Sequence, residues 1–448
     1  MKSRTGIGKS HVPLSCCNCI LNTGKFANRQ LMGRKILETA GCFILFLVMV
    51  ELVIYFLAPI YDFPAPQPFS GDRFYNPYKG MDSTQWRKAN FHFHTKAWGG
   101  LTSGRHNTHE AFYQTYKTLG YDAAQISNYQ SIDDFYKDSS FYVPVYEHGF
   151  GIRKKHQVLI GARKVLWLDY SLVQNVNHKQ HILNCLRPNA EIVAIAHPDW
   201  ENGYSFDDMH RLTNYDLVEA LDANWRSIPQ WDAALSAGHP VFILADDDAH
   251  DIANPYEIQR MCTYINAPSV RGEELIQSLK TGKAFGAEIF MGEGETFTQK
   301  VKHAREVPVV NSVVMKSDTL LVSVSERPLK VTFIGQDGEI RKIVRLKDKA
   351  WYKFKPEDTY IRTEIQFLKY YRYPQVGAGT LFYLNPVFRY NGEKPSNALQ
   401  AGINWPRTLI QRILGIGSII GLAVAAYYAR RNRKKKDSPM TSDKSTMR

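Results

Sequence analysis

The sequence predicts an α/β domain followed by an antiparallel β domain, with one membrane-spanning helix on either side of the pair. Short apolar runs alternate with helical patterns over residues 88–290, which is typical of an α/β fold with a parallel sheet. Apolar and polar residues then alternate with a period of two over residues 306–392, which indicates antiparallel strands. Apolar runs at residues 41–60 and 409–428 flank both regions, and each is close to the roughly 20 residues that cross a bilayer.

The positive charge of the chain is concentrated at its two ends. Residues 1–40 contain seven Lys or Arg and one Glu, and residues 429–448 contain eight Lys or Arg and two Asp. The tails therefore account for +12 of the formal net charge of +13. Nucleic-acid binding is not expected, because a nucleic-acid protein carries its basic residues as a stripe on the folded part.

The position of these basic tails predicts the membrane topology. Positive residues flank both apolar runs, so the positive-inside rule places the two tails in the cytoplasm and the region between the spans outside it, in a periplasm or lumen. A cleaved signal peptide is the alternative for residues 41–60. About forty residues precede this run and no small-residue cleavage site follows it, which favours an uncleaved anchor.

The region between the spans begins with a proline-rich stretch and continues into the two domains. Residues 61–87 contain Pro64, Pro66 and Pro68 and are expected to form an extended linker. A helix is expected around Glu110–Leu119 and another at Glu273–Leu279. Asp337–Gly338 predicts a hairpin turn in a small antiparallel β-sandwich. The expected strands of the α/β domain are Asn90–His94, Gln157–Ile160, Ile192–Ala196, Leu217–Leu221 and Val241–Ala245.

Side chains that bind metals recur next to these strands. His92 and His94 lie two residues apart in an apparent strand, so both imidazoles point to one face and can hold one ion. Such a pair alone is more often two ordinary histidines. The other candidate ligands are Glu147, His197, Asp248 and His250, which follow apolar runs, and His156, which opens one. Because the loops after parallel strands converge in barrel-like α/β enzymes, these residues predict one metal centre.

Four motifs, in order, resemble those of the polymerase-and-histidinol-phosphatase (PHP) domain superfamily. They are NFHFHT at Asn90–Thr95, YEHGFGIRKKH at Tyr146–His156, AHPDW at Ala196–Trp200 and ADDDAH at Ala245–His250. The resemblance spans about 88–290. WDAALSAGHP at Trp231–Pro240 and a β domain ending in Asn385–Pro386–Val387 resemble a branch of predicted metal-dependent phosphoesterases. The family implies a distorted (β/α)7 barrel that holds up to three divalent ions.

The resemblance also implies a ligand set. One ion would take His92, His94, Glu147 and Asp248, and a second would share Glu147 and take His156 and His197. His250 matches a histidine of the third site. The family's Ser-Asp-Gly is replaced by Trp98–Gly99–Gly100 and its Thr-Asp-His by Ser127–Asn128–Tyr129. Both positions normally help to hold the third ion, so we expect two. His106 or His109 could restore a third set, or be ordinary loop histidines.

The expected activity is hydrolysis of a phosphate ester by a water that two divalent ions activate. Zn, Mn and Fe all accept histidine and carboxylate ligands. His92, His94, Glu147, Asp248 and His250 are the expected catalytic residues. Lys96, Arg105 and Arg153 are candidates for binding an anionic substrate, a phosphorylated small molecule or lipid. Asp246 or Asp247 is expected to orient a ligand histidine. The alternative is a receptor or scaffold with a weakened metal site that binds a ligand without turnover.

Overall fold

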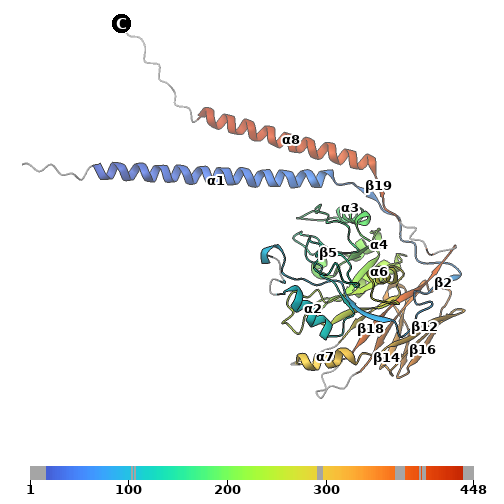
Figure 1. The fold of residues 1–448 in the computed structure, drawn as a ribbon. Coiled ribbons are helices and arrows are strands. Elements are labelled where there is room, and N and C mark those ends of the chain that lie inside the picture. Colours follow the sequence, from blue (N-terminus) through green and yellow to red (C-terminus); the bar gives the residue numbers. More distant parts are fainter. Residues whose placement is uncertain are drawn as a thin grey trace, which may run out of the picture. The chain divides into compact units, whose positions relative to one another are not determined.

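The computed structural model describes residues 17–101, 104, 107–289, 296–368, 379–392, 395 and 400–436. The chain forms two compact units, which we call the helical unit, Met1–Leu57 with Leu409–Arg448, and the body, Ala58–Thr408. Figure 1 shows the two long helices of the helical unit and the mixed helices and strands of the body. The prediction of a mixed α/β protein with two apolar helices is confirmed at this level.

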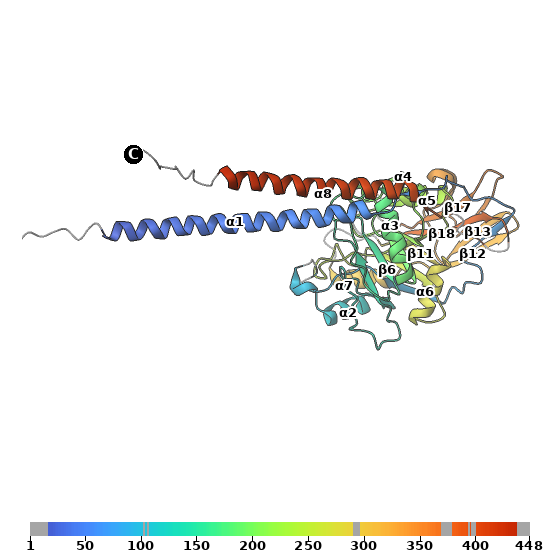
Figure 2. The ribbon, with the colours of Figure 1, turned by 90° about the horizontal axis from the view of Figure 1, so that it is seen from above.

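The helical unit consists of α1 (Cys17–Leu57) and α8 (Trp405–Lys436), which lie next to each other in Figures 1 and 2. Their segments Ile36–Leu57 and Trp405–Asn432 are long and apolar enough to cross a membrane. Apolar side chains are exposed at the four successive positions 43–46, which cover a full turn. A helix that is apolar all round and exposed is suited to lipid rather than to a protein core. A hydrogen bond joins the two helices, because Arg412 Nη2 of α8 donates to the Leu57 carbonyl of α1 at 2.8 Å.

The segment 61–87 is not the free linker that the sequence suggested. It contains β1 (Tyr61–Asp62), which pairs with β19 (Gly402–Ile403), and β2 (Arg73–Tyr75), which pairs with β18. Between them the Gln67 amide donates to the Ala237 carbonyl at 2.9 Å. A Cβ at Gly238 would lie 1.8 Å from the Gln67 carbonyl oxygen, so only glycine permits this approach. Prolines keep the segment extended, and the body binds it.

A five-stranded sheet forms one part of the body, in the order β5-β6-β7-β8-β9. Its strands are β5 (Val145–His148), β6 (Gln157–Ile160), β7 (Ile192–Ile195), β8 (Leu217–Leu221) and β9 (Phe242–Ala245). The strands β7, β8 and β9 are parallel, whereas β6 runs antiparallel to both β5 and β7. The expected parallel sheet is therefore only partly present. The short loop between β5 and β6 leaves no room for a crossover helix, so these strands pair as a hairpin.

A nine-stranded sheet follows the order β15-β14-β17-β18-β11-β10-β3-β4, with β2 beside β18. Only β3 and β4 are parallel in it. The strands not yet given are β3 (Trp86–Asn90), β4 (Ala123–Ala124), β10 (Met261–Asn266), β11 (Ala284–Glu288), β14 (Lys330–Ile334), β15 (Ile340–Arg345), β17 (Tyr360–Gln366) and β18 (Leu381–Tyr390). The sheet thus joins strands from both predicted domains.

A three-stranded antiparallel sheet contains β12 (Val310–Lys316), β13 (Thr319–Val324) and β16 (Lys349–Lys353). Its apolar side chains share one core with those of β14, β17 and β18. The turn between β14 and β15 is the expected one, with Asp337 and Gly338 both at positive φ. The antiparallel strands are confirmed, but a β-sandwich separate from the α/β domain remains a prediction.

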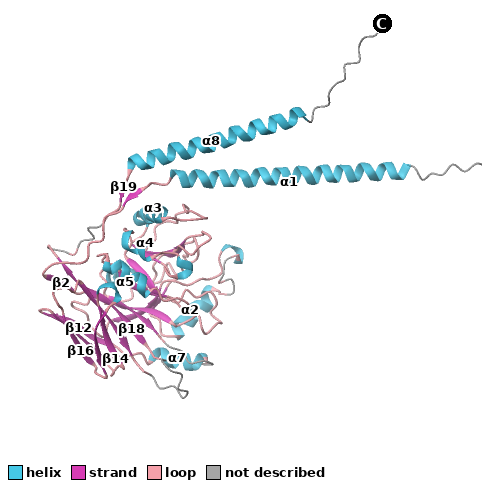
Figure 3. Cartoon of the chain, turned by 180° about the vertical axis from the view of Figure 1, so that it is seen from behind, coloured by secondary structure: helices cyan, strands magenta, loops and turns pink. Residues whose placement is uncertain are grey.

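Helices connect and cover these sheets. In Figure 3, α3 and α4 lie at one end of the body, and β12, β14, β16 and β18 gather at the other. The remaining helices are α2 (His109–Thr118), α3 (Val176–Leu186), α4 (Phe206–Arg211), α5 (Ile228–Ser236), α6 (Gly272–Lys280) and α7 (Phe297–Arg305). The helices α3, α4 and α5 lie in the connections from β6 to β9, as expected for an α/β fold.

The described strands do not close into a (β/α)7 barrel. The strands that the family pattern would use are divided between the five-stranded sheet and the edge β3-β4 of the nine-stranded sheet. Among the described residues, isolated backbone bridges link the two sheets between Phe93 and Ala249 and between Tyr129 and Glu147. These bridges lie where the candidate ligands gather.

A buried ion pair joins the α/β part to the antiparallel strands. Arg362 of β17 donates to both carboxylate oxygens of Asp232 in α5, at 2.6 and 2.8 Å. Arg362 is 2% exposed and Asp232 6%. Arg362 also donates from Nη1 to Glu364 Oε1 at 2.6 Å. Loss of Asp232 would still leave Nε and Nη2 without an acceptor at a buried site, and breaking a buried ion pair is strongly destabilising.

We predict that Asp232→Ala lowers the free energy of unfolding by about 3–5 kcal/mol. Urea unfolding of the full chain in detergent, followed by circular dichroism, measures the change. The exposed pair Asp134–Lys137, with N···O at 3.9 Å, provides the control, because Asp134→Ala should cost no more than about 1 kcal/mol. Equal stability of the Asp232 variant and the wild type would contradict a structural role for the pair.

Candidate metal centre

His92 and His94 lie just beyond β3, which ends at Asn90 and not at His94 as expected. The segment stays extended because the Phe93 amide donates to Ser127 Oγ at 2.8 Å and Phe93 forms a bridge with Ala249. In extended backbone, residues two apart point to the same side. Both imidazoles therefore enter the region between the two sheets, where Glu147 of β5 and Asp248 after β9 also lie.

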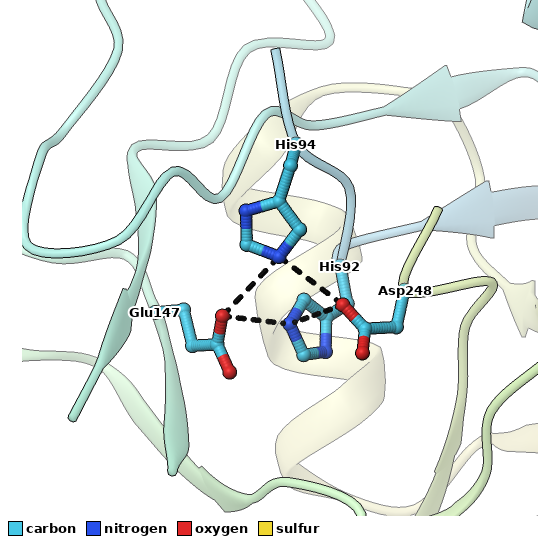
Figure 4. Close-up of side chains that lie close together, drawn as sticks. All are labelled: His92, His94, Glu147 and Asp248. Carbon is cyan, nitrogen blue, oxygen red and sulfur yellow. Dashed lines mark hydrogen bonds and ion pairs between the residues drawn. The ribbon is translucent and has the colours of Figure 1, made fainter. Parts of the chain in front are cut away.

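Four buried side chains form the first candidate ligand group, His92, His94, Glu147 and Asp248. Figure 4 shows both imidazole Nε2 atoms directed at the two carboxylates. His92 Nε2 lies 3.3 Å from Glu147 Oε2 and 3.2 Å from Asp248 Oδ1. The corresponding distances from His94 Nε2 are 3.2 and 3.1 Å. Tetrahedral ligands at about 2.0–2.1 Å from an ion stand roughly 3.3 Å apart, so these four atoms have the spacing of one coordination shell.

A second group shares the carboxylate of Glu147. It contains Glu147, His156 and His197, all buried. Glu147 Oε1 lies 2.5 Å from His156 Nδ1 and 3.4 Å from His197 Nε2, while Oε2 faces the first group. One carboxylate thus lies between two sets of nitrogens, which is the arrangement that a pair of neighbouring cations requires.

Glu219 is a functional candidate that the sequence interpretation missed. Its Oε1 lies 2.8 Å from His92 Nδ1, and its Oε2 accepts from the His197 amide at 2.9 Å. With the Nδ1 proton held by Glu219, the lone pair of His92 is on Nε2, which faces the first group. The signal in the sequence was an acidic residue in the middle of the apolar strand Leu217–Leu221, since a buried carboxylate needs a partner.

The hydrogen bonds of Asp246 and Asp247 go to groups other than the ligand histidine rings. Asp246 Oδ1 accepts from the Phe91 amide at 2.8 Å. Asp247 accepts from the Tyr116 hydroxyl and from the amides of residues 259–261. The first carboxylate fixes the segment that carries the ligand histidines, and the second fixes the loop before β10.

The charges of the centre are strongly coupled. Burial alone would raise the pKa of Glu147, but His156 and His92 lower it more, so the net pKa is well below the ordinary value. Burial opposes a charge on His92, but Asp248 and Glu219 raise its pKa well above the ordinary value. The carboxylates therefore stay ionised and draw positive charge between them, whether as protons or as metal ions.

His250 and Tyr129 border the centre without belonging to a ligand group. His250 Nδ1 lies 2.7 Å from the Asp248 carbonyl oxygen, and its Nε2 lies 3.5 Å from the Tyr129 hydroxyl. The Tyr129 ring stacks on His94 with 4.5 Å between centroids. Burial, together with the negative charges of Glu147 and Asp248, raises the pKa of Tyr129 well above the ordinary value.

Two of the three candidate substrate-binding cations lie among the described residues. Lys96 and Arg153 are exposed, and Arg105, like His106, lies outside the described residues. His109 begins α2 and lies 2.7 Å from Asp133 through Nε2. It therefore does not enter the ligand groups found among the described residues.

Comparisons with known proteins give little further information. No family model and no curated protein matches this chain. Among solved structures, the chain is similar to a two-domain protein from Bacteroides vulgatus that contains a predicted PHP-like metal-dependent phosphoesterase. The two are 13% identical with a TM-score of 0.34, and the alignment covers 68% of this chain and 96% of that one. The PHP resemblance therefore rests on the four motifs.

We predict that Glu219→Gln weakens metal binding by about 10–100-fold, because the amide no longer holds the Nδ1 proton of His92 as a carboxylate does. Competition with a chromogenic chelator measures the affinity in the full chain. Glu191→Gln is the control, since Glu191 pairs with Lys280 at 2.5 Å on the surface. If both variants bind metal as the wild type does, Glu219 has no role in orienting His92.

Proposed function

We propose that this chain is a membrane-anchored, divalent-metal-dependent phosphoesterase whose body holds two ions. His92, His94, Glu147 and Asp248 would hold one of them, and His156 and His197 would hold the other together with Glu147. The proposal rests on one observation, the shared carboxylate of Glu147 between two buried groups of ligand atoms.

The fit of the residues to cations is supported by atoms that lack partners. Among the described residues, His92 Nε2 and Glu147 Oε2 are buried and have no hydrogen bond, although they lie only 3.3 Å apart. Leaving two such atoms unpaired costs about 1–3 kcal/mol each, and more when they are charged. A divalent cation coordinated by both removes this cost.

The bound ions and the protein side chains would contribute different parts of the reaction. Two bound divalent ions supply charge stabilisation and lower the pKa of water to near neutral. The chain fixes the ligands through Glu219 and Asp246 and excludes bulk water by burying all six ligand side chains. The Tyr129 ring stacks on His94, and its hydroxyl lies 3.5 Å from His250 Nε2, so Tyr129 and His250 would both border a bound phosphate ester.

We further propose that β3 to β9 act as a distorted barrel of the PHP type. The bridges at Phe93–Ala249 and Tyr129–Glu147 support this, because they link the segments after β3 and β4 to the segment after β9 and to β5. The basic tails support a topology with both ends in the cytoplasm and the body on the opposite side.

A binding protein without turnover is the second candidate. Its support is the replacement of the family's third-site residues, with Tyr129 in the position of a histidine. Such a receptor would retain the ions and bind a phosphorylated ligand but would not hydrolyse it.

We predict a stoichiometry of two ions per chain in the purified full-length protein, measured by plasma mass spectrometry. His197→Ala should retain about one ion, because it removes a ligand of the second group and leaves His92, His94, Glu147 and Asp248 in place. Glu147→Ala should retain less than one, because it removes the shared carboxylate. His109→Ala, outside both groups, should still bind two. A single ion in the wild type would contradict the shared-carboxylate arrangement.

We also predict that His92→Ala and Glu147→Ala abolish hydrolysis of phosphate esters while the antiparallel strands stay folded, because the substitutions affect only the centre. A panel of phosphomonoesters and phosphodiesters, with the metal-loaded full chain, measures the rates. Circular dichroism checks the fold, and His109→Ala provides the active control. Full metal retention without hydrolysis by the wild type would favour the receptor, and unchanged rates in either alanine variant would exclude the assigned ligands.

A further inference from the structure

Large apolar side chains are exposed on the loops beside the candidate metal centre. We call this set the apolar rim, and it consists of Trp98, Phe150, Ile152, Trp167, Leu172 and Val173. Ile152 and Val173 are each 71% exposed and Trp167 is 59% exposed. Scattered apolar residues are normal on a surface, whereas a contiguous group marks a place that contacts another molecule or a membrane.

The rim residues are neighbours in space. The Ile152 amide donates to the Ser171 carbonyl at 2.8 Å, so the segment that carries Phe150 and Ile152 runs beside the one that carries Leu172 and Val173. The ring of Trp98 contacts the edge of Trp167, with 5.8 Å between centroids. The six side chains therefore form two sets, Phe150, Ile152, Leu172 and Val173 in one and Trp98 and Trp167 in the other.

Both sets adjoin metal ligands. A Cβ at Gly149 would lie 2.5 Å from His156 Cδ2, so the backbone next to Phe150 lies against this ligand. Trp98 Nε1 donates to the Tyr129 carbonyl at 2.8 Å, and the Tyr129 ring stacks on His94. A molecule that touches the rim is thus close to the centre.

A hydrogen bond links the segment that follows the rim to the segment that follows α1. The chain leads from Val173 through Asn175, the N-cap residue of α3, to Asn177, whose Oδ1 accepts from the Tyr61 amide at 2.8 Å. Tyr61 is only four residues beyond the end of α1 at Leu57, a span of at most about 14 Å. The pairing of β1 with β19 brings the start of α8 to the same place.

Basic side chains lie next to the apolar rim in the sequence. Arg153 is exposed next to Ile152, and Lys154 Nζ lies 4.6 Å above the ring of Trp200. Trp200 in turn packs against the ligand His197. Tryptophans and basic side chains beside apolar ones are the combination that favours the headgroup layer of an anionic membrane.

We propose that the apolar rim enters the headgroup layer of the membrane crossed by α1 and α8, and that the centre acts on the phosphate ester of a membrane phospholipid. The second part rests on the proposed function. The hydrolysed bond joins phosphorus to an ester oxygen, which leaves with a proton from water while the phosphorus gains the hydroxyl group.

Tryptophan quenching tests the membrane contact without any need for catalysis. The full chain is reconstituted in vesicles of phosphatidylcholine and phosphatidylglycerol whose phosphatidylcholine chains carry bromine, which quenches nearby indoles. The double variant Trp98→Phe/Trp167→Phe should lose part of the quenched fluorescence of the wild type. Trp351→Phe is the matched control, since Trp351 is 54% exposed on β16, away from the rim. If the quenched fraction of the double variant equals that of the wild type, the proposal is overturned. A rim covered by a second copy of the chain would give this result.

Hydrolysis of two substrates tests the substrate class. Ile152→Asp/Val173→Asp should lower kcat/KM on phosphatidylglycerol in vesicles roughly tenfold or more, since each variant side chain loses its burial in lipid. Hydrolysis of soluble p-nitrophenyl phosphate should not change. Ile340→Asp, at a position 61% exposed on β15, should change neither rate.

The two proposals fail in different ways. Equal loss on both substrates, or no loss on vesicles, overturns the lipid substrate. An absence of hydrolysis of any phosphate ester by the metal-loaded wild type overturns the enzyme itself, and the quenching result then decides the membrane contact alone.

Discussion

The burial of one carboxylate among histidines is the constraint on which the site depends. Glu147 is fully buried, and its two oxygens face His92 and His94 on one side and His156 and His197 on the other. A charge withdrawn from water is stable only with opposite charge beside it. The carboxylate is therefore stabilised by positive charge on either side, and the loops after β3 and β7 place histidines there.

The scaffold meets this requirement with hydrogen bonds between segments that belong to different sheets. His92 and His94 follow a strand of the nine-stranded sheet, whereas the carboxylates come from the five-stranded one. Asp246 after β9 accepts from the Phe91 amide, and the His94 amide donates to the Ala249 carbonyl at 3.0 Å. These bonds fix the relative position of the ligands, because a shift between the sheets would break the bridge at Phe93 along with the ligand spacing.

The sequence predicted the members of the site better than the architecture around it. All six ligands outside the third site lie together, because residue type and position at strand ends carry that information. The antiparallel pairing of β5 with β6 and the common sheet of both domains were missed, since apolar runs reveal strands but not their partners. Glu219 was missed because an interior strand position indicates packing, whereas its role follows from His92, which is 127 residues away. The proline-rich segment 61–87 was interpreted from composition alone, and only its bonds to the body show that it is bound.

The short connections between body and helices bear on the substrate. Both connections end in the pair β1 and β19, so under the proposed membrane anchoring the body would be attached at two neighbouring points. A centre confined in this way meets a membrane component at an effective concentration in the millimolar range, without any affinity of its own. A soluble substrate gains nothing from the same confinement. Under the proposed anchoring, two membrane spans would therefore be a physical advantage for an enzyme of lipids and none for an enzyme of soluble esters.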